Sequence, residues 1–393
     1  SNGLEKRPKL RFPGFDEPYK QCRIGDIYAE RSQRGASNME LLSVTMNDGV
    51  KPRSEIEGKD NSSEDKSNYK IVRKGDMVYN SMRMWQGANG ISPCDGIVSP
   101  AYTVLMPKQE INNGYFAALF KSANLINEFR KNSQGMTSDT WNLKYPQIET
   151  IKVQIPSVSE QDKVSELFGV LDARIVAQAQ LIEALKKYKR GVMQSIFRHS
   201  SHEDWAIVRL GEIFKKVSRR NSNGDIKNVI TNSAEYGLIP QRDFFDKDIA
   251  VDGNTSNYYV IEEGDFVYNP RKSNTAPCGP FNRYNLKEKG IISPLYTCLV
   301  LQEDINPAYL AWYFKSDAWY RYIYDNGSQG VRHDRVSMTD DLLMGIPVYL
   351  PASGKQSQIA EILNAIENRL SAAQDEYNML IKLRDGFTQQ LFI

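Results

Sequence analysis

The sequence predicts an α+β protein with two similar mixed α/β domains, separated by two long antiparallel helices that form an intramolecular coiled coil. Three observations lead to this prediction. The chain contains two tandem copies of one pattern, each copy closes with a long heptad repeat, and the remainder alternates short β-like runs with clusters of Gly, Pro, Asn and Ser. A duplicated chain whose helices pair in this way is expected to be pseudo-twofold symmetric.

Matching motifs in the same order show the duplication. From the last of them to the C-terminus, corresponding residues lie 195 positions apart. Solenoid repeats are roughly 20 to 50 residues long, so this period indicates a duplicated domain together with its connector. The matching pairs are Gly-Asp-x-Val-Tyr-Asn at 75–80 and 264–269, Gly-Ile-x-Ser-Pro at 96–100 and 290–294, and Ser-Gln-Gly at 133–135 and 328–330.

A heptad pattern of apolar residues runs through the end of each copy, in the same register in both. A basic residue, Lys189 or Arg384, interrupts it at the same place. A helix over residues 159–197 would measure about 58 Å, so we expect the two helices to bury their seams against each other. The predicted seam residues are Val164, Phe168, Leu171, Ile175, Ile182 and Leu185 in the first helix and Ile359, Leu363, Ile366, Leu370, Tyr377 and Leu380 in the second.

Local signals mark the ends of the two helices. Ser353 followed by Gln356 predicts a capping box at the start of the second helix. Gly191 and Gly386 occupy equivalent positions near the C-terminal ends. Because the heptad pattern continues past each glycine, we favour a close approach of another helix backbone over a C-terminal cap at these positions.

The globular part of each copy is expected to be mixed. Two β-like runs precede one helix-like segment, which leads into the Ser-Gln-Gly turn. The predicted strands cover 70–79 and 97–106 in the first copy and 258–268 and 291–301 in the second, and the helical segments cover 115–132 and 307–325.

Composition limits the class of protein. The chain has 393 residues, of which 40% are hydrophobic and 25% charged, and a net charge of +2. No apolar run approaches the ~18 residues of a membrane span, so we expect a cytoplasmic protein without a membrane partner. The four cysteines lack the spacing of a zinc site or a disulfide framework, which favours reduced thiols.

Loops carry most of the polar and aromatic residues in which the two copies differ. Arg and Lys pair with guanine and Asn and Gln with adenine, so the loops after Tyr-Asn and Ser-Gln-Gly could read two unlike short DNA sequences. Loop divergence without function is the alternative. The candidate DNA contacts are Asn80, Arg83, Trp85, Gln86 and Gln134 in the first copy and Arg219, Arg220, Asn269, Arg271, Lys272, Gln329, Arg332 and Arg335 in the second.

The sequence offers no catalytic or metal-binding pattern. His199 and His202 lack a third metal ligand nearby, and the remaining histidine is His333. Tyr268-Asn269-Pro270 is similar to the start of the Asn-Pro-Pro-aromatic signature of adenine methyltransferases, but Arg271 stands where the second proline should be. We therefore expect no catalytic residue, metal or cofactor in this chain.

In their order, these motifs resemble the specificity subunit of Type I restriction-modification enzymes over essentially the whole chain. The resemblance rests on the leader at 10–15, on the aromatic-then-Ile/Leu-Gly-acidic-Ile start of each copy, and on the helix ends at 191–197 and 386–392. It also rests on the series Pro156-(3)-Glu160-Gln161-(2)-Val164-(6)-Leu171-Asp172-(2)-Ile175. The second copy departs at Lys355, where the family has glutamate, and at Glu367, where it has aspartate.

The resemblance implies two target-recognition domains, each reading one half of a split double-stranded DNA site, spaced by the two helices. It also implies two docked methyltransferase subunits, restriction and translocase subunits in the full complex, and S-adenosylmethionine and ATP with Mg on those partners. The expected boundaries are an N-terminal arm at 1–18, recognition domains at 19–156 and 205–352, helices at 157–198 and 353–393, and a linker at 199–204.

Two other functions stay open from the sequence alone. A protein-interaction scaffold that does not bind DNA could also use two domains with aromatic loops. A stand-alone methyltransferase would bind S-adenosylmethionine tightly without a partner.

Overall fold

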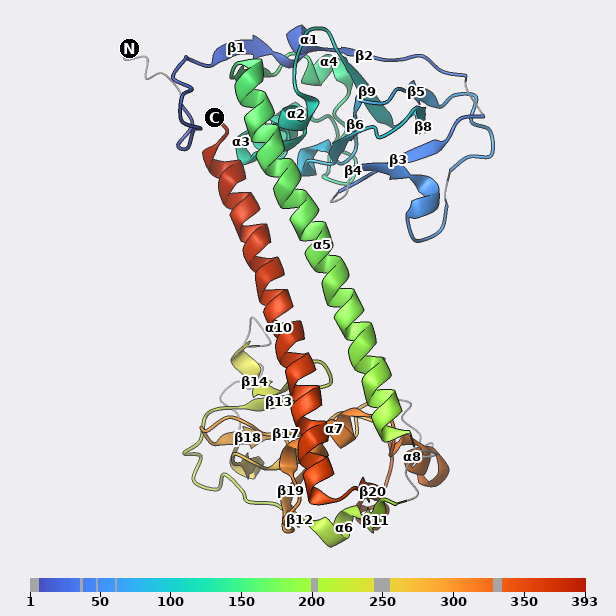
Figure 1. The fold of residues 1–393 in the computed structure, drawn as a ribbon, viewed down its shortest axis with the longest axis vertical. Coiled ribbons are helices and arrows are strands. Elements are labelled where there is room, and N and C mark those ends of the chain that lie inside the picture. Colours follow the sequence, from blue (N-terminus) through green and yellow to red (C-terminus); the bar gives the residue numbers. More distant parts are fainter. Residues whose placement is uncertain are drawn as a thin grey trace. The chain divides into compact units, whose positions relative to one another are not determined.

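The computed structural model describes residues 7–35, 38–46, 49–60, 62–198, 204–243, 255–327 and 334–393. The chain divides into two compact units, residues 1–180 with 374–393 and residues 181–373. Helices α5 (Val158–Phe197) and α10 (Ser353–Gln390) each begin in one unit and end in the other (Figure 1). The predicted helix boundaries are therefore close to those observed, whereas all but residue 204 of the predicted linker lies outside the described residues.

The first unit contains three small sheets and a group of short helices. The strands are β1 (Lys20–Arg23), β2 (Tyr28–Glu30), β3 (Leu41–Thr45), β4 (Gly49–Pro52), β5 (Lys70–Val72), β6 (Met77–Asn80), β7 (Asn89–Ile91), β8 (Gly96–Val98), β9 (Tyr102–Pro107) and β10 (Lys152–Ile155). The helices are α1 (Ile24–Ile27), α2 (Asn113–Leu119), α3 (Ala123–Asn132) and α4 (Tyr145–Ile148), with 3₁₀ turns η1 (Arg53–Glu55) and η2 (Met84–Gln86). The sheet orders are β2-β9-β6-β7, β4-β3-β8-β5 and β1-β10.

The second unit repeats this order of elements. Its strands are β11 (Ala206–Arg209), β12 (Phe214–Val217), β13 (Ile230–Ser233), β14 (Gly237–Pro240), β15 (Tyr259–Ile261), β16 (Phe266–Tyr268), β17 (Phe281–Arg283), β18 (Gly290–Ile292), β19 (Thr297–Leu301) and β20 (Pro347–Leu350). Its short helices are α6 (Leu210–Ile213), α7 (Pro307–Lys315), α8 (Tyr320–Asn326) and α9 (Asp340–Met344), with 3₁₀ turns η4 (Gln241–Asp243) and η5 (Thr255–Asn257). The sheet β12-β19-β16-β17 corresponds to β2-β9-β6-β7, and β11-β20 corresponds to β1-β10.

Each predicted long strand is in fact two short strands in different sheets. Gly75 and Gly264 adopt φ values of 89° and 97°, a left-handed conformation that turns the chain between β5 and β6 and between β15 and β16. The predicted helical segments are also divided. The Ser122 hydroxyl accepts the Leu125 N–H and so caps α3 separately from α2, and α7 likewise ends before α8.

Two hydrophobic cores stabilise each unit. In the first unit the larger core lies among the sheet β2-β9-β6-β7, the short helices, the start of α5 and the end of α10. The rings of Phe168 on α5 and Phe392 after α10 stack at 5.7 Å within it. In the second unit Phe197 joins Ile359 and Leu363 in the equivalent core. Since burying one phenylalanine contributes about 2 kcal/mol, these contacts fasten the helices to the globular parts.

The two long helices pair antiparallel within each unit, as predicted. In the first unit Asp172 binds Arg384 at 2.5 Å, and in the second Lys189 binds Glu367 at 2.7 Å. The two basic interruptions of the heptad pattern are therefore the partners of acidic residues on the other helix. All predicted seam residues are buried or half-buried.

Two predictions about the helix ends are wrong. Gly191 and Gly386 are helical, and a side chain added at either would meet nothing within 4 Å, so neither marks a close approach. Both helices continue past them, which also excludes a cap. Ser353 is the first residue of α10. Gln356 does not form a capping box because its side chain hydrogen-bonds to the backbone of Asn306 and Pro351 instead.

A buried glutamine instead joins each helix to its globular part. The Gln161 side chain accepts the backbone N–H of Asn112 at 3.0 Å and donates to the Pro156 carbonyl at 3.0 Å. Gln356 does the same with Asn306 and Pro351, at 3.0 and 2.9 Å. Asn112 and Asn306 are in turn the N-caps of α2 and α7. We call this arrangement the glutamine clamp.

Among the described residues, no helix is long and apolar enough to cross a membrane. The four cysteines are free thiols, as predicted.

Candidate nucleic-acid interface

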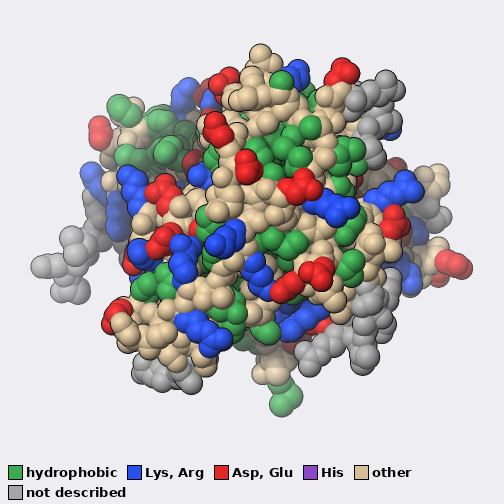
Figure 2. Space-filling view, turned by 90° about the horizontal axis from the view of Figure 1, so that it is seen from below, with side chains coloured by type: hydrophobic (Ala, Val, Ile, Leu, Met, Phe, Trp, Pro, Cys, Tyr) green, Lys and Arg blue, Asp and Glu red, His purple; other side chains and the backbone are tan. Residues whose placement is uncertain are grey.

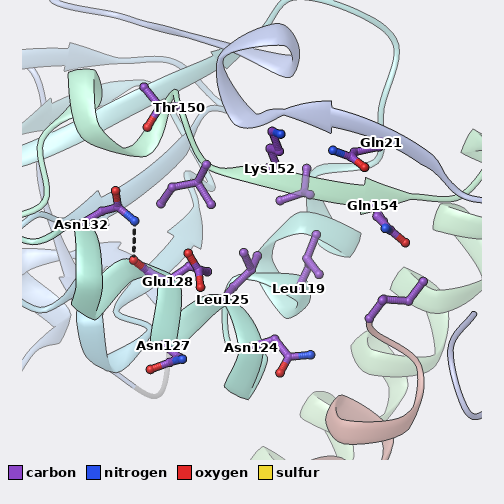
Figure 3. Close-up of a pocket in the computed structure, with 13 residues that line it drawn as sticks. Gln21, Leu119, Asn124, Leu125, Asn127, Glu128, Asn132, Thr150, Lys152 and Gln154 are labelled. Atoms are coloured by element: carbon purple, nitrogen blue, oxygen red, sulfur yellow. Dashed lines mark hydrogen bonds between the residues drawn. The ribbon is translucent and has the colours of Figure 1, made fainter. Parts of the chain in front are cut away.

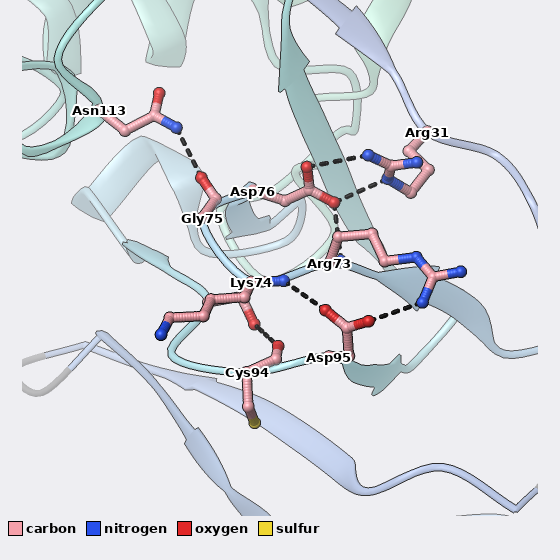
Figure 4. A network of polar contacts seen from close by, with 9 residues as sticks. Arg31, Arg73, Lys74, Gly75, Asp76, Cys94, Asp95 and Asn113 are labelled. Atoms are coloured by element: carbon pink, nitrogen blue, oxygen red, sulfur yellow. Dashed lines mark hydrogen bonds and ion pairs between the residues drawn. The ribbon is translucent and has the colours of Figure 1, made fainter.

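An ion pair between an arginine and a buried aspartate positions, in each unit, the strand that leads to the candidate loop. Asp76, the acidic residue of the Gly-Asp-x-Val-Tyr-Asn motif, accepts two hydrogen bonds from Arg31 at 2.7 and 3.1 Å. It also accepts the backbone N–H of Arg73 at 2.8 Å, which closes the turn before β6 (Figure 4). Asp95 binds Arg73 beside it. The motif therefore builds a strand end, as the sequence predicts.

Arg219 occupies the corresponding place in the second unit. Its guanidinium binds Asp265 and also Glu262, the latter at 3.0 Å. Burial raises the pKa of Asp265, while the Glu262 N–H and Arg219 oppose that shift. The charge of Arg219, a predicted DNA contact, is thus compensated by two carboxylates of the same unit. The cluster of basic residues around it in the sequence does not predict this pairing.

The predicted residues of the first unit meet in one pair of loops. Asn80 ends β6, and its side chain accepts the Met82 N–H at 3.0 Å. Exposed Arg83 precedes η2, which contains Trp85 and exposed Gln86. Gln134, in the loop after α3, pairs with Asn142 through backbone hydrogen bonds of 3.0 and 2.8 Å.

An aromatic contact joins these two loops. Trp85 packs edge-on against Trp141 with ring centroids 5.2 Å apart, and Arg130 lies over the Trp85 ring at 5.5 Å. Trp141 and Arg130 were missed from the sequence, because nothing local links either residue to η2. Met136, on the same loop as Gln134, has a completely exposed side chain. The first unit therefore presents aromatic and apolar side chains beside the exposed cations Arg83 and Arg130.

The second unit presents arginines at the corresponding place. Arg271 follows β16 and forms an antiparallel bridge with Arg335, whose loop returns from the region after α8. Backbone hydrogen bonds from Lys272 to Asp334 and from Val336 to Pro270, 2.9 and 2.8 Å long, secure the two segments. Asp334 was not among the candidate residues, because only the pairing of the two segments in three dimensions brings it beside Lys272 and Arg271.

The loops are anchored alike in both units. In the first, the Leu143 N–H donates to the Ser81 carbonyl at 2.8 Å, and Ser81 follows the same Tyr-Asn pair as Pro270 does. Leu143 precedes Pro156 by 13 positions, whereas Val336 precedes Pro351 by 15. The returning segment is therefore shifted by two residues between the units, although the anchor is the same.

The other predicted contacts are dispersed or fall outside the described residues. Arg220 donates to the Asn257 side chain at 3.1 Å, away from the loop pair in sequence. Asn269 is buried, and its side chain accepts the Arg271 N–H at 2.9 Å. Gln329 and Arg332 lie outside the described residues, as do all three histidines. No observation tests DNA contact directly, so the individual assignments stay predictions.

A hollow of about 710 Å³ lies elsewhere in the first unit, between the two-stranded sheet β1-β10 and α3 (Figure 3). Amide side chains line much of it, including Asn124, Asn127 and Gln154. Its two charged residues are Lys152 and Glu128, and Glu128 already binds Lys131 at 2.7 Å. No acid–base pair converges there, so the lining does not indicate catalysis.

Charge on the molecular surface is interspersed. The face drawn in Figure 2 mixes basic and acidic side chains without a field of one sign, in keeping with the net charge of +2. Within the described ranges, no group of three or more His, Cys, Asp or Glu residues could hold a metal ion. The candidate interface is therefore defined by the loop pairs rather than by total charge.

Comparison with known proteins gives a consistent result. A family model for the Type I restriction modification DNA specificity domain matches the chain twice, over residues 17–187 and 202–380. A curated relative, the Type I restriction enzyme MjaVIII specificity subunit of Methanocaldococcus jannaschii, is 23% identical over 345 residues, which cover 80% of this chain and 77% of that protein.

Solved structures share the fold. The S subunit of a Type I restriction-modification system from M. genitalium superimposes with a TM-score of 0.58 at 15% identity and 99% coverage of both chains. The HsdS subunit from Thermoanaerobacter tengcongensis gives a TM-score of 0.51 at 16% identity and 98% coverage of both chains.

Proposed function

Since this chain belongs to the family of the Type I restriction modification DNA specificity domain and carries that domain twice, we propose that each loop pair reads one half of a bipartite DNA site. The chain is the DNA specificity subunit of a Type I restriction-modification system and is not itself an enzyme. One observation carries the assignment of the loops. The two units share their anchors and ion pairs but present Trp85 and Trp141 in one and Arg271 and Arg335 in the other.

The partners follow from the same proposal. Two methyltransferase subunits dock on the helices and adjoining domain surfaces, and restriction and translocase subunits complete the assembly on cytoplasmic DNA. Exposed apolar side chains on α5 and α10, namely Val170, Tyr188, Met379 and Leu383, are available for such contacts. S-adenosylmethionine, ATP and Mg belong to those partners, and this chain itself holds no cofactor.

A domain exchange tests the proposal. Residues 19–156 are replaced by the recognition domain of another specificity subunit, and the methylated adenines are then mapped. Only one half of the methylated sequence should change, because the second loop pair is intact. Exchange of residues 205–352 is the matched control and should change the other half. A change in both halves, or in neither, contradicts the assignment of one half-site to each unit.

Salt dependence separates DNA reading from a protein-only scaffold. Binding of the chain with its methyltransferase subunits to duplex DNA should weaken by roughly 0.9 log units per neutralised phosphate for each log unit of salt. A protein-interaction scaffold would show a flat response in the same gel-shift titration.

A further inference from the structure

The arginine pair of the second unit has an unusual electrostatic arrangement. Arg271 and Arg335 are directly opposite each other in an antiparallel bridge, so their side chains leave the backbone on the same side. Both guanidinium groups lie near Tyr296. Burial raises the pKa of this tyrosine, and the charges of Arg271 and Arg335 oppose the shift.

Like charges opposite each other destabilise a strand pair, so this arrangement requires compensation. Within the part of the chain that the structure describes, Arg335 is 3.9 Å from Asp334, whereas no ion pair involves Arg271. Lys272 adds a further positive charge beside them. The site therefore has excess positive charge and unused donors on an exposed loop.

We propose that Arg271 and Arg335 together read a G·C base pair in the half-site of the second unit. This inference rests on the proposed function and assigns the pair a base class. A planar guanidinium can donate two parallel hydrogen bonds to the guanine O6 and N7 acceptors in the major groove, and the bridge places two residues that carry this group opposite each other.

The neighbouring carboxylate separates base reading from phosphate binding. Asp334 lies 3.9 Å from Arg335, and its negative charge weakens the attraction of the arginines for a phosphate without cancelling it. A carboxylate accepts a hydrogen bond from the cytosine amino group, so the same Asp334 complements the other base of a G·C pair. The first unit has Met82 and Asn142 at its loop junction, and neither carries a charge.

Conservative variants test the assignment. Arg271→Lys and Arg335→Lys keep the positive charge but lose the planar fork that donates two hydrogen bonds to guanine. The full chain, assembled with its methyltransferase subunits, selects from duplexes randomised in the second half-site. We expect the preference for guanine at one position to fall roughly 10- to 100-fold, with the first half-site and the salt slope unchanged.

Arg321→Lys is the matched control, because Arg321 is a highly exposed arginine on α8 of the same unit. Equal weakening on every sequence, with a shallower salt slope for Arg271→Ala, would identify a phosphate clamp and overturn the assignment. An unchanged guanine preference in both lysine variants would overturn it as well. If the wild-type assembly itself showed no half-site preference, the proposed function would fail first, and that result is distinguishable from the other two.

Discussion

The starts of the two long helices share one contact but carry opposite charges beside it. The clamps formed by Gln161 and Gln356 match bond for bond. Directly before them stand Glu160, with 1% of its side chain exposed, and the exposed Lys355. Glu160 accepts hydrogen bonds from Arg11 at 2.9 and 2.8 Å. Both units thus keep the neutral hydrogen bonds of the glutamine clamp. The residue before the clamp differs: a buried glutamate stands in the first unit, where Arg11 of the N-terminal arm neutralises it, and an exposed lysine stands in the second.

The N-terminal arm offers a reason why the second unit has Lys355 where the first has Glu160. In the first unit the backbone N–H of Leu10 also donates to the Gln390 carbonyl at 2.9 Å, so the arm contacts the end of α10 as well as the start of α5. A glutamate at position 355 would need a cation of its own. Lysine avoids that need because its ammonium group can stay in water.

The largest expected effect comes from removing the arm's cation. Among the described residues, Arg11→Ala leaves the buried Glu160 carboxylate with the Tyr19 hydroxyl as its side-chain donor, and should lower the free energy of unfolding by about 3 kcal/mol. Lys355→Ala should change it by less than about 0.5 kcal/mol. Denaturant unfolding measures both variants. Similar losses would show that the two helix starts are not electrostatically different.

The clamp should behave equally in the two units. Gln161→Ala and Gln356→Ala each remove the partner of a part-buried backbone N–H and of a buried proline carbonyl, so each should lower stability by about 2 kcal/mol. Both variants are compared in the same unfolding assay. A large effect in one unit and none in the other would refute the equivalence that the matching distances indicate.

The smallest effect is expected at the helix pairing. Asp172→Asn and Glu367→Gln each remove one interhelix ion pair and should cost about 0.5 kcal/mol, because these side chains are partly exposed. High salt should reduce the difference from wild type. Glu166→Gln, which removes an exposed pair within α5, serves as control. A loss that is independent of salt would argue against a charge interaction.

The sequence predicts features whose signals are local or periodic. The duplication, both seams and the strand-end motif follow from spacing alone, and the structure confirms them. Features that join distant residues escape such analysis. Gln161 meets Asn112 across 49 positions, and Arg219 meets Asp265 across 46, so the clamp and the compensation of Arg219 appear only in three dimensions. The divided strands were missed because a glycine can also stand inside a continuous strand. Only the positive φ values of Gly75 and Gly264 show that the chain turns there.

The main-chain bond that both units use to anchor the returning segment has an evolutionary consequence. Leu143 and Val336 donate an N–H to the Ser81 and Pro270 carbonyls, a bond that any residue except proline could make, and their apolar side chains are buried in the larger core of each unit. The bond is present in both units although the residue that donates it is shifted by two positions in the sequence. Insertions, deletions and substitutions can therefore accumulate in the exposed residues before this anchor, while the anchor keeps its main-chain bond and its buried apolar side chain.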